Sequence, residues 1–340
     1  MKIAVIAKTR LPIAEPFRGG LESFTHSLCQ EYLRLGHEIT LYAHKDSDPK
    51  LNVKGFYGEE KRDSDYFSIY EDDEYLSILN DIETNDFDVV HNNSTHELPI
   101  LWGAKSSVPL ITTIHTPPIS KLKAAIKIAS HSKNLHFVLP SRSFQKTWEP
   151  FLDNGSTVIY NGVDLYKWPP VRENAEYLFW FGRIVHAKGL DIVIDAAHEV
   201  NMPLKFAGPI DDETYFEEQI KPRIRRSDLY LGHLKQSEIQ LNMKAAAAIV
   251  SAVRWEEPFG LTNIEAMASG VPVAGFERGA FRELIDIKSG VVSEQKNVKS
   301  LAKAITDAMA LDSKKVRQHA KQFSLQIMAE NYIKYFEDLI

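Results

Sequence analysis

Short runs rich in valine and isoleucine, separated by longer amphipathic segments, are the feature that most constrains the fold of this chain. Such runs are typical of strands buried on both faces, whereas half-exposed strands alternate apolar and polar residues. Strands of this kind occur in parallel sheets, whose crossover connections are usually helices. The pattern therefore predicts an α/β protein built on doubly wound parallel sheets.

The individual elements follow from the same pattern. In the first half we expect strands at 2–7, 38–43, 88–91, 109–113, 136–139 and 157–160. In the second half we expect strands at 177–181, 204–207, 229–231, 247–251 and 271–274. The clearest helix is predicted at 21–35, with Gly36 as its C-terminal cap. The acid-rich segment 59–88 is expected to be solvated and locally mobile.

The chain is long enough for two domains, since about 150 residues is an ordinary domain length. The alternation of strands and helices restarts after the turn-rich stretch 161–170. A polar, turn-rich segment is typical of a linker between domains. We therefore place the domain boundary there, with the first domain at 1–162 and the second beginning at 163.

Composition excludes several classes of protein. A formal charge of -6, from 40 Lys+Arg against 46 Asp+Glu, has the wrong sign for a protein that follows phosphate backbones, so no nucleic-acid partner is expected. Cys29 is the single cysteine, which excludes an intramolecular disulfide and a multi-cysteine zinc site. The apolar run Ile3 to Ala7 is too short for a signal peptide, and no run approaches the ~20 residues of a membrane span. We expect a cytoplasmic protein.

No metal site is predicted. The histidines nearest to a ligand pair are His91 and His96, and a spacing of five does not place both on one helical face. A basic stretch between Lys121 and Lys133 also carries Lys123 and Lys127 without an acid. A solvated helix face is the simpler interpretation, and peripheral contact with an anionic membrane is the alternative.

Motifs that bind ligands are expected where strands end, because ligands of open α/β sheets bind outside the carboxyl ends of the strands. The loop after the first strand closes with Gly19 and Gly20 before a helix. Paired glycines let backbone N–H groups approach an anion, and the helix N-terminus favours negative charge. A simple turn is the alternative, because neither the P-loop nor the GxGxxG pattern is present.

His115 follows the strand expected at 109–113 and precedes Pro117 and Pro118. The prolines hold the loop out of a helix, so the imidazole stands at a strand tip. There it can hydrogen-bond a substrate hydroxyl or share a proton, which makes it a candidate catalytic residue. A structural histidine is the competing interpretation.

Arg183 and Lys188 flank a second strand-to-helix turn, after the strand at 177–181. A guanidinium fork and an ammonium group on one turn can bind a diphosphate. Ordinary surface salt bridges are the alternative.

The most specific motif is EPFGLTNIEAMASGVPV at 257–273. Glu257 is expected in a loop after a strand, and Gly260 at the start of a helix that Gly270 ends. Glu265 falls in the early turns of this helix. The two carboxylates can therefore flank one ligand and accept hydrogen bonds from its hydroxyl pairs.

The start of the same helix supplies the complementary groups. Free N–H groups near Gly260, Leu261 and Thr262 can meet phosphate oxygens, which favours a bound nucleotide sugar. For Glu265 a simpler explanation exists, because Thr262 and Glu265 match the S/T-x-x-E capping box. That explanation leaves Glu257 unaccounted for.

At these residues the chain resembles the retaining, nucleotide-sugar-dependent glycosyltransferases with the GT-B fold, glycosyltransferase family 4 and glycosyl transferases group 1. The E-x7-E motif of that family matches Glu257 to Glu265. Supporting segments, in the family's order, are the Gly19-Gly20 loop, TIHTPP ending at 118, IYNGVD at 159–164, FGRIVHAKG at 181–189 and LYLGHL at 229–234. Arg278-Gly279-Ala280 departs from the family, in which a Gly-Gly pair is common.

The resemblance implies two Rossmann-like domains facing each other across a cleft. The N-terminal domain, 1–162, would be the acceptor side and would be completed by the C-terminal helix at about 323–340. The C-terminal domain, 163–322, would bind the nucleotide-sugar donor.

The resemblance also implies roles for single residues. Arg183 and Lys188 would bind the donor diphosphate and act in catalysis, and Glu265 would bind the ribose. Glu257 would hold the transferred sugar. Further residues implied at the donor are Gly19, Gly20, Leu234 at the base, Phe259, Gly260, Leu261 and Thr262. His115 would lie beside the reaction centre.

The expected reaction moves a hexose-type sugar from a UDP- or GDP-sugar to an acceptor hydroxyl of unknown kind, with retention and without a metal cofactor. The DxD-like Asp86-Phe87-Asp88 precedes its strand and so lies at the wrong end of the sheet for a metal motif. Two alternatives stay open. They are a nucleotide-sugar epimerase on the same architecture and a non-catalytic nucleotide-sugar-binding module.

Overall fold

A computed structural model describes residues 1–56, 64–153, 155–168, 170 and 175–340. The chain divides into two compact units, Met1–Asn161 with Leu325–Ile340, and Gly162–Ser324. These limits lie within two residues of the domain boundaries expected from the sequence.

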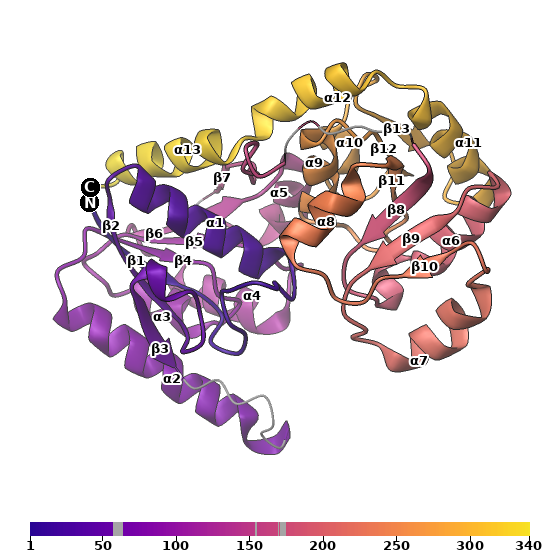
Figure 1. The fold of residues 1–340 in the computed structure, drawn as a ribbon. Helices are drawn as coiled ribbons and strands as arrows, with labels where there is room; N and C mark the ends of the chain where they lie inside the picture. The colour runs from indigo at the N-terminus through magenta and orange to yellow at the C-terminus, as the bar shows by residue number, and fades with distance from the viewer. Residues whose placement is uncertain (57–63, 154, 169, 171–174) are drawn as a thin grey trace. The chain divides into compact units, whose positions relative to one another are not determined.

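The first unit is built on a seven-stranded sheet in the order β3-β2-β1-β4-β5-β6-β7, with every neighbouring pair parallel (Figure 1). Its strands are β1 Lys2–Ile6, β2 Glu38–His44, β3 Val53–Phe56, β4 Val89–Asn92, β5 Leu110–Thr113, β6 Leu135–Leu139 and β7 Thr157–Val158. Its helices are α1 Gly20–Arg34, η1 Pro49–Leu51, α2 Ser64–Thr84, α3 Leu98–Gly103, α4 Ser120–Ala129, α5 Arg142–Trp148, η2 Glu149–Phe151 and α13 Leu325–Glu337.

The second unit has a six-stranded sheet in the order β10-β9-β8-β11-β12-β13, again parallel throughout. Its strands are β8 Tyr177–Phe181, β9 Leu204–Ala207, β10 Leu229–Tyr230, β11 Ala246–Ser251, β12 Val273–Phe276 and β13 Gly290–Ser293. Its helices are η3 His186–Lys188, α6 Leu190–Glu199, α7 Glu213–Tyr215, η4 Phe216–Ile220, η5 Lys221–Arg223, α8 Gln236–Met243, α9 Leu261–Ala268, α10 Phe281–Leu284, α11 Val298–Met309, α12 Ser313–Ala320 and η6 Lys321–Phe323.

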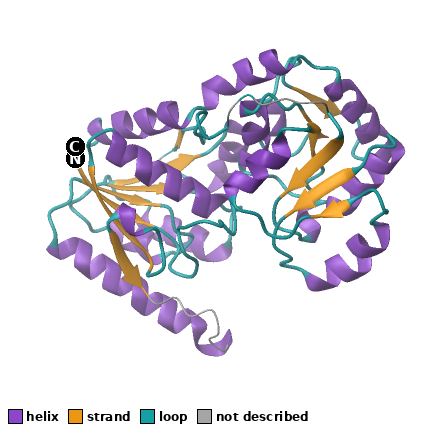
Figure 2. Ribbon diagram, in the orientation of Figure 1, coloured by secondary structure: helices purple, strands orange, loops and turns teal. Residues whose placement is uncertain are grey.

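The α/β class predicted from the sequence is confirmed in both units. Figure 2 shows helices between the successive strands of each sheet, as parallel pairing requires. The central strands β4, β5 and β12 are buried along their whole length. Both faces of these strands are thus covered, as expected for central strands of a parallel sheet.

Two edge strands, β3 and β13, were not expected from the sequence. β3 reads Val-Lys-Gly-Phe and none of its residues is fully buried. β13 is four residues long and begins with a glycine. A strand at a sheet edge needs little apolar sequence, so periodicity gives a weak signal for it.

The acid-rich segment 59–88 was expected to be solvated and locally mobile, and part of it instead contributes to the core of the first unit. Residues 64–84 form α2, while 57–63 lie outside the described residues. Tyr75, Ile78, Leu79 and Ile82 are buried in the core of the first unit. Their spacing is that of one helical face, which the many surrounding acids concealed.

α13 belongs to the first unit although it follows the second in sequence, and it lies beside α1 in Figure 1. A buried polar chain anchors it. The Tyr332 hydroxyl lies 2.9 Å from Thr113 Oγ1, which is 2.8 Å from His91 Nε2. His91 Nδ1 is 3.2 Å from the Tyr32 hydroxyl of α1. His91 is thus a satisfied core residue rather than a metal ligand, and burial lowers its pKa to about 3.

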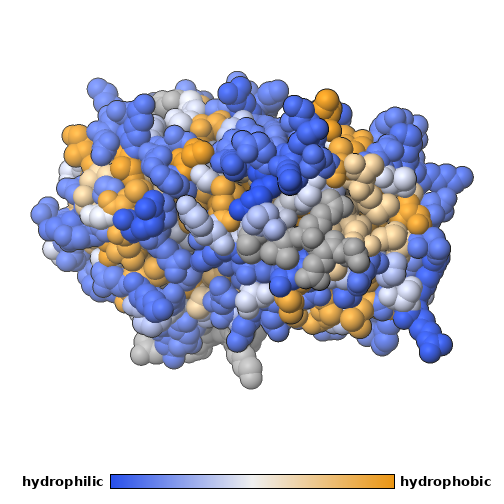
Figure 3. All heavy atoms as spheres, turned by 45° about the horizontal axis from the view of Figure 1, so that its top comes forward, coloured by the Kyte–Doolittle hydropathy of each residue, from blue (hydrophilic) through white to orange (hydrophobic). Residues whose placement is uncertain are grey.

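The surface carries no continuous apolar face in the view of Figure 3, where hydrophilic residues predominate and hydrophobic ones form small groups. Among the described residues, no helix is long and apolar enough to cross a membrane. In α4, Lys121 pairs with Glu97 at 3.1 Å and Lys123 lies 5.0 Å from the Phe151 ring centroid. These lysines have partners within the unit, and contact with a membrane stays a prediction.

The end of β11 approaches the start of α6 so closely that only glycine fits there. Gly189 has φ +67, and a Cβ at this position would lie 2.1 Å from the Ala252 carbonyl oxygen. Gly232 has a similar φ of +74, but a Cβ there would meet nothing within 4 Å. The two glycines share backbone strain and differ in available space.

Gly189→Ala should therefore destabilise the second unit more than Gly232→Ala does. Left-handed backbone costs an L-residue roughly 1–2 kcal/mol at either position. Overpacking should add about 1–3 kcal/mol at position 189 only. Urea unfolding of both variants and the wild type measures the difference. Equal losses would show that the turn at 189 moves aside without cost.

Candidate functional site

The carboxyl ends of β8 and β11 bring Lys188 and Glu257 together. Lys188 ends the short η3 turn before α6, and Glu257 lies in the loop after β11. Lys188 Nζ is 2.6 Å from Glu257 Oε2, and Trp255 Nε1 donates to the same oxygen at 2.9 Å. The two charged side chains are 22% and 18% exposed. An anionic ligand at this edge can therefore compete with Glu257 for the ammonium group.

Arg183 begins the same strand-to-helix turn. Its Nη1 lies 3.7 Å from Asp211 Oδ2, which is an ion pair too long for a hydrogen bond. The guanidinium is 46% exposed. A guanidinium exposed to this degree can donate hydrogen bonds to a phosphate group.

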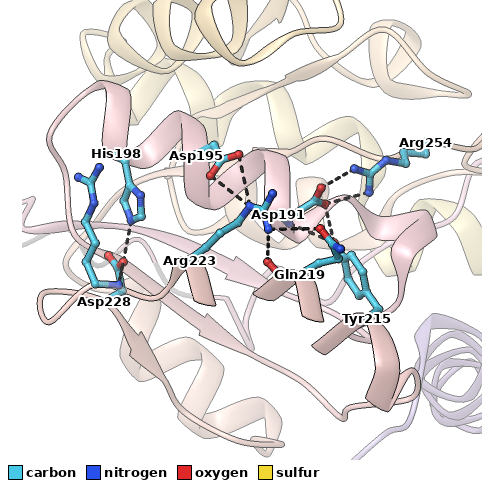
Figure 4. Close-up of polar contacts among 9 residues, drawn as sticks. Asp191, Asp195, His198, Tyr215, Gln219, Arg223, Asp228 and Arg254 are labelled. Atoms are coloured by element: carbon cyan, nitrogen blue, oxygen red, sulfur yellow. Dashed lines mark hydrogen bonds and ion pairs between the residues drawn. The ribbon is translucent and has the colours of Figure 1, made fainter. Parts of the chain in front are cut away.

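Arg254, which the sequence analysis missed, holds this turn in place (Figure 4). Its guanidinium donates to both carboxylate oxygens of Asp191, at 2.9 and 2.6 Å, and to the His186 carbonyl at 2.7 Å. Its own N–H donates to the Ala187 carbonyl at 2.9 Å. The end of β11 is therefore fixed to the residues just before Lys188.

Asp191 is further held from α7. The Tyr215 hydroxyl donates to Asp191 Oδ1 at 2.6 Å. Burial raises the pKa of this carboxyl, but the hydrogen bonds from Arg254 and Tyr215 outweigh it and lower the pKa. The sequence does place Asp191 in the first turn of α6, where acidic residues are favourable. Its pairing with Arg254 could not be predicted from the spacing of the two residues.

The same face of α6 continues this polar contact away from the site, as Figure 4 shows. Asp195 Oδ1 lies 3.4 Å from Arg223 Nε, and His198 Nε2 lies 2.8 Å from Asp228 Oδ2. Asp228 also accepts from the Leu204 N–H at 3.0 Å. One face of α6 therefore holds the segment before β10 through three side chains spaced by four and three residues. They are Asp191, Asp195 and His198.

The helix α9 begins where the sequence predicts it. Gly260 is its N-cap with φ +97, a left-handed conformation that favours glycine, and no side chain caps the helix. The first N–H groups of a helix have no partner within it. Asn263 is buried, and its Oδ1 has no hydrogen-bond partner among the described residues. This helix start thus offers unused donors beside the loop that holds Glu257.

Glu265 is buried, at 9% exposure, in the middle of α9. Burial raises its pKa to about 7. The capping-box explanation for this residue fails, because the N-cap is Gly260 and Thr262 is already the second helical residue. Within the described part of the chain, no side chain or backbone group donates to this carboxyl.

The loop at 278–280 packs directly on the residues around Glu257. Gly279 has φ +53, and a Cβ there would lie 2.1 Å from the Glu257 carbonyl oxygen. The Ala280 N–H donates to that oxygen at 3.1 Å, and the Gly279 N–H donates to Glu256 Oε2 at 2.6 Å. Of the two positions where the family commonly has glycine, only position 279 requires it for the close approach. The other position holds Ala280, which is fully buried.

Two further expected donor residues differ in exposure. Leu234 is half-buried in the loop between β10 and α8. Phe259 is 3% exposed, with its ring centroid 6.0 Å from that of Phe323. The Phe259 ring therefore belongs to the packing of the unit, and a donor-binding role for this residue stays a prediction.

In the first unit, His115 follows β5 as expected. Its Nε2 donates to Asn93 Oδ1 at 3.2 Å, and Phe24 packs edge-on at 4.7 Å. Burial, with a smaller contribution from the charge of Lys8, lowers its pKa to about 3. The imidazole is therefore neutral at pH 7, and its Nδ1 is left as an acceptor.

Gly19 and Gly20 begin α1. Gly19 is the N-cap in an extended conformation, which other residues also adopt, and Gly20 is the first helical residue. A Cβ on Gly19 would lie 3.1 Å from Glu22 Oε2. A carboxylate thus already stands near this helix N-terminus, and a donor-binding role for the two glycines stays a prediction.

One group in the first unit has the composition of a metal site. The ligand atoms of Asp72, His96 and Glu97 lie within 4.8 Å of one another. Lys121 pairs with Glu97, and His96 Nδ1 accepts the Leu98 N–H at 3.2 Å. With Nδ1 engaged in this way, the His96 Nε2 proton faces Asp72 at 3.0 Å, so these contacts describe a hydrogen-bonded cluster.

The expected site residues divide between the two units. Arg183, Lys188, Leu234, Glu257, Phe259, Gly260, Leu261, Thr262 and Glu265 belong to the second unit. Gly19, Gly20 and His115 belong to the first.

Comparison with known proteins identifies both halves. Residues 18–167 match the family model of Glycosyltransferase Family 4, and residues 166–324 match that of Glycosyl transferases group 1. The chain is similar to the lipopolysaccharide core biosynthesis mannosyltransferase of Rhizobium meliloti, with 24% identity over 71% of this chain and 80% of that protein.

Solved structures show the fold. Sucrose-phosphate synthase from Thermosynechococcus elongatus superposes with a TM-score of 0.83 at 15% identity, over 100% of this chain and 99% of that one. The Anabaena protein HepE in complex with UDP-glucose gives 0.77 at 18% identity, over 99% and 100%. The fold is GT-B, and with both halves matched the chain belongs to the glycosyltransferases of family 4 and group 1 and is a glycosyltransferase.

Proposed function

We propose that this enzyme transfers a hexose-type sugar from a UDP- or GDP-sugar to an acceptor hydroxyl, with retention of anomeric configuration and without a metal ion. The observation that carries the proposal is Glu265, a buried carboxyl that no described protein group satisfies. Such a group can accept hydrogen bonds from a ligand that supplies donors. The paired hydroxyls of a ribose are donors of the required kind.

The diphosphate would bind between the turn of Arg183 and Lys188 and the start of α9. The two cations offer charge-assisted hydrogen bonds, and the helix offers free N–H groups. Charge develops on the diphosphate as the glycosyl bond breaks. Groups fixed in advance around the leaving group therefore stabilise the transition state.

Glu257 would hold the transferred sugar. In the structure its Oε2 is bound by Lys188 and Trp255. When a diphosphate draws Lys188 away, the carboxylate becomes available to sugar hydroxyls. The pairing of Lys188 with Glu257 thus makes phosphate binding and sugar binding mutually supportive.

His115 would assist from the acceptor side as a neutral imidazole. Its low pKa makes it unsuited to carry a positive charge at neutral pH, so its role is to hydrogen-bond a hydroxyl through Nδ1. The departing phosphate would take the acceptor proton in a front-face attack.

The relatives support the chemical class. The Rhizobium meliloti protein is a mannosyltransferase, and HepE has been solved in complex with UDP-glucose. A thermal-shift panel of UDP-, GDP-, ADP- and TDP-sugars, each with and without EDTA, tests the donor. A sugar nucleotide at 100 times its dissociation constant should add about 2.7 kcal/mol of stability. Absence of stabilisation by any of them contradicts the proposal.

The stereochemistry can be tested with the best donor from that panel. Proton NMR of the sugar released slowly to water, or transferred to an added alcohol, reports its anomeric configuration. Retention is expected. A sugar that is epimerised while still on the nucleotide would instead identify the epimerase, and binding without any turnover would identify a binding module.

Glu265→Gln should change the pH dependence of stability. Burial raises the pKa of this carboxyl to about 7 in the folded protein, from 4.5 for an ordinary glutamate, so the folded protein binds this proton more tightly than the unfolded one. The wild type should therefore lose about 2–4 kcal/mol as pH rises from below 4.5 to above 7. The variant should lack this loss and be the more stable protein at pH 8. Denaturation at pH 5 and 8, with the exposed Glu294→Gln as control, measures it.

Glu257→Gln should keep nucleoside-diphosphate affinity and lose most turnover. Its proposed partner is the transferred sugar, so its contribution should peak in the transition state. Titration with the free nucleotide and turnover at saturating donor measure the two effects. Unchanged turnover would remove Glu257 from the mechanism.

Arg183→Ala and Lys188→Ala should each weaken nucleoside-diphosphate binding by about 1.5–3 kcal/mol, the range for a hydrogen bond to a charged group. Because both would grip one diphosphate, the double variant should lose less or more than the sum. Calorimetry of the wild type, both single variants and the double variant, with and without EDTA, tests this. Additive small losses, or a wild type inactivated by EDTA, would reassign the leaving-group role to a metal.

His115→Ala should lower turnover by roughly 10²-fold while the fold stays intact. His115→Asn keeps a hydrogen-bonding side chain and should recover part of this loss. Steady-state kinetics and thermal unfolding separate the interpretations. A variant that melts far lower but keeps its specific activity would make His115 a structural residue.

A further inference from the structure

A cavity of about 780 Å³ lies in the first unit, at the sheet edge opposite His115. Ser132, Lys133 and His136 line it from the residues around the start of β6, and Ser156 and Thr157 line it from the start of β7. Tyr335 of α13 also contributes. The cavity thus sits at the amino ends of these strands, whereas His115 follows the carboxyl end of β5.

The lining has the chemistry of an anion site. Lys133, His131 and His136 supply nitrogen atoms, and Thr157 and Tyr335 supply hydroxyl groups. The hydroxyls of Ser132 and Ser156 already form hydrogen bonds within the protein. No carboxylate is among the lining residues, and within the described part of the chain no acidic side chain pairs with Lys133. An ammonium group without a counterion beside several hydroxyls favours a phosphate group.

The remaining walls favour a ligand larger than phosphate itself. The cavity volume falls within the range of small-molecule sites, roughly 300–1,000 Å³. The rings of His136 and Tyr335 meet edge to face at 6.2 Å, and Phe137 and Leu135 add apolar surface. A ring carrying one phosphate would match both the charged and the apolar walls.

We propose that this cavity binds a small phosphate monoester of sugar size, at a site separate from the donor. The ligand would join the β6–β7 edge to α13, because Lys133, which precedes β6, and Tyr335 of α13 both line the cavity. Tyr335 stands three residues after Tyr332, whose hydroxyl contacts Thr113. Binding would therefore strengthen the attachment of α13 to the first unit.

Calorimetric titration with glucose 6-phosphate tests the proposal, with inorganic phosphate and glucose as the two partial ligands. Glucose 6-phosphate should bind saturably, phosphate more weakly, and glucose not measurably. Lys133→Ala should weaken binding roughly tenfold or more, as for a lost charge-assisted hydrogen bond. Lys127→Ala removes an exposed lysine of α4 that does not line the cavity, and it should bind like the wild type.

Two further measurements make the result decisive. The Arg183→Ala/Lys188→Ala double variant should bind glucose 6-phosphate as the wild type does, which separates this site from the proposed donor site. Amide hydrogen exchange in α13 should slow when the ligand is present. Absence of saturation at tens of millimolar, equal effects of Lys127→Ala and Lys133→Ala, loss of binding in the double variant, or equal binding of glucose would each overturn the proposal.

Discussion

The bidentate ion pair between Arg254 and Asp191 is the interaction on which the site in the second unit depends. It ties the loop after β11 to the first turn of α6, where Gly189 leaves room for the Ala252 carbonyl. Because of this joint, Lys188 and Glu257 reach each other although they follow different strands. A partly buried, bidentate arginine–carboxylate pair is a suitable device, since its geometry fixes direction as well as distance. None of these groups needs to touch a ligand itself.

The start of α9 shows the opposite principle, because it leaves polar groups unsatisfied. Glu265 is buried without a described donor, Asn263 Oδ1 lacks a partner, and no side chain caps the helix. Each of these groups can form a hydrogen bond with a ligand. Their concentration in a single short helix is difficult to explain by packing, and it is consistent with groups that a ligand completes. The joint at Arg254 and the start of α9 would thus have complementary roles in the proposed donor site.

Prediction from sequence succeeded where one local rule determines the structure. The strands Tyr177–Phe181 and Leu204–Ala207 were expected with their observed limits, because most of their residues are apolar and buried. Gly260 was expected to start a helix because few other residues adopt its φ. Prediction failed where the structure depends on a residue that is far away in the sequence. α2 is held by four apolar residues among many acids, and nothing in the local sequence links Arg254 to Asp191.

The state of His115 also depends on a partner that spacing does not reveal. Its position at a strand tip suggested a group that can share a proton, but burial and the nearby charge of Lys8 keep the imidazole neutral. Lys8 follows β1, which is separated from β5 by β4 in the sheet order, so the two loops meet only because parallel strands end at a common edge. A neutral imidazole held by Asn93 can orient a hydroxyl but is a weak proton carrier. In the proposed reaction the acceptor proton must then leave with the phosphate, which places the main chemical demand on the cations that receive the leaving group.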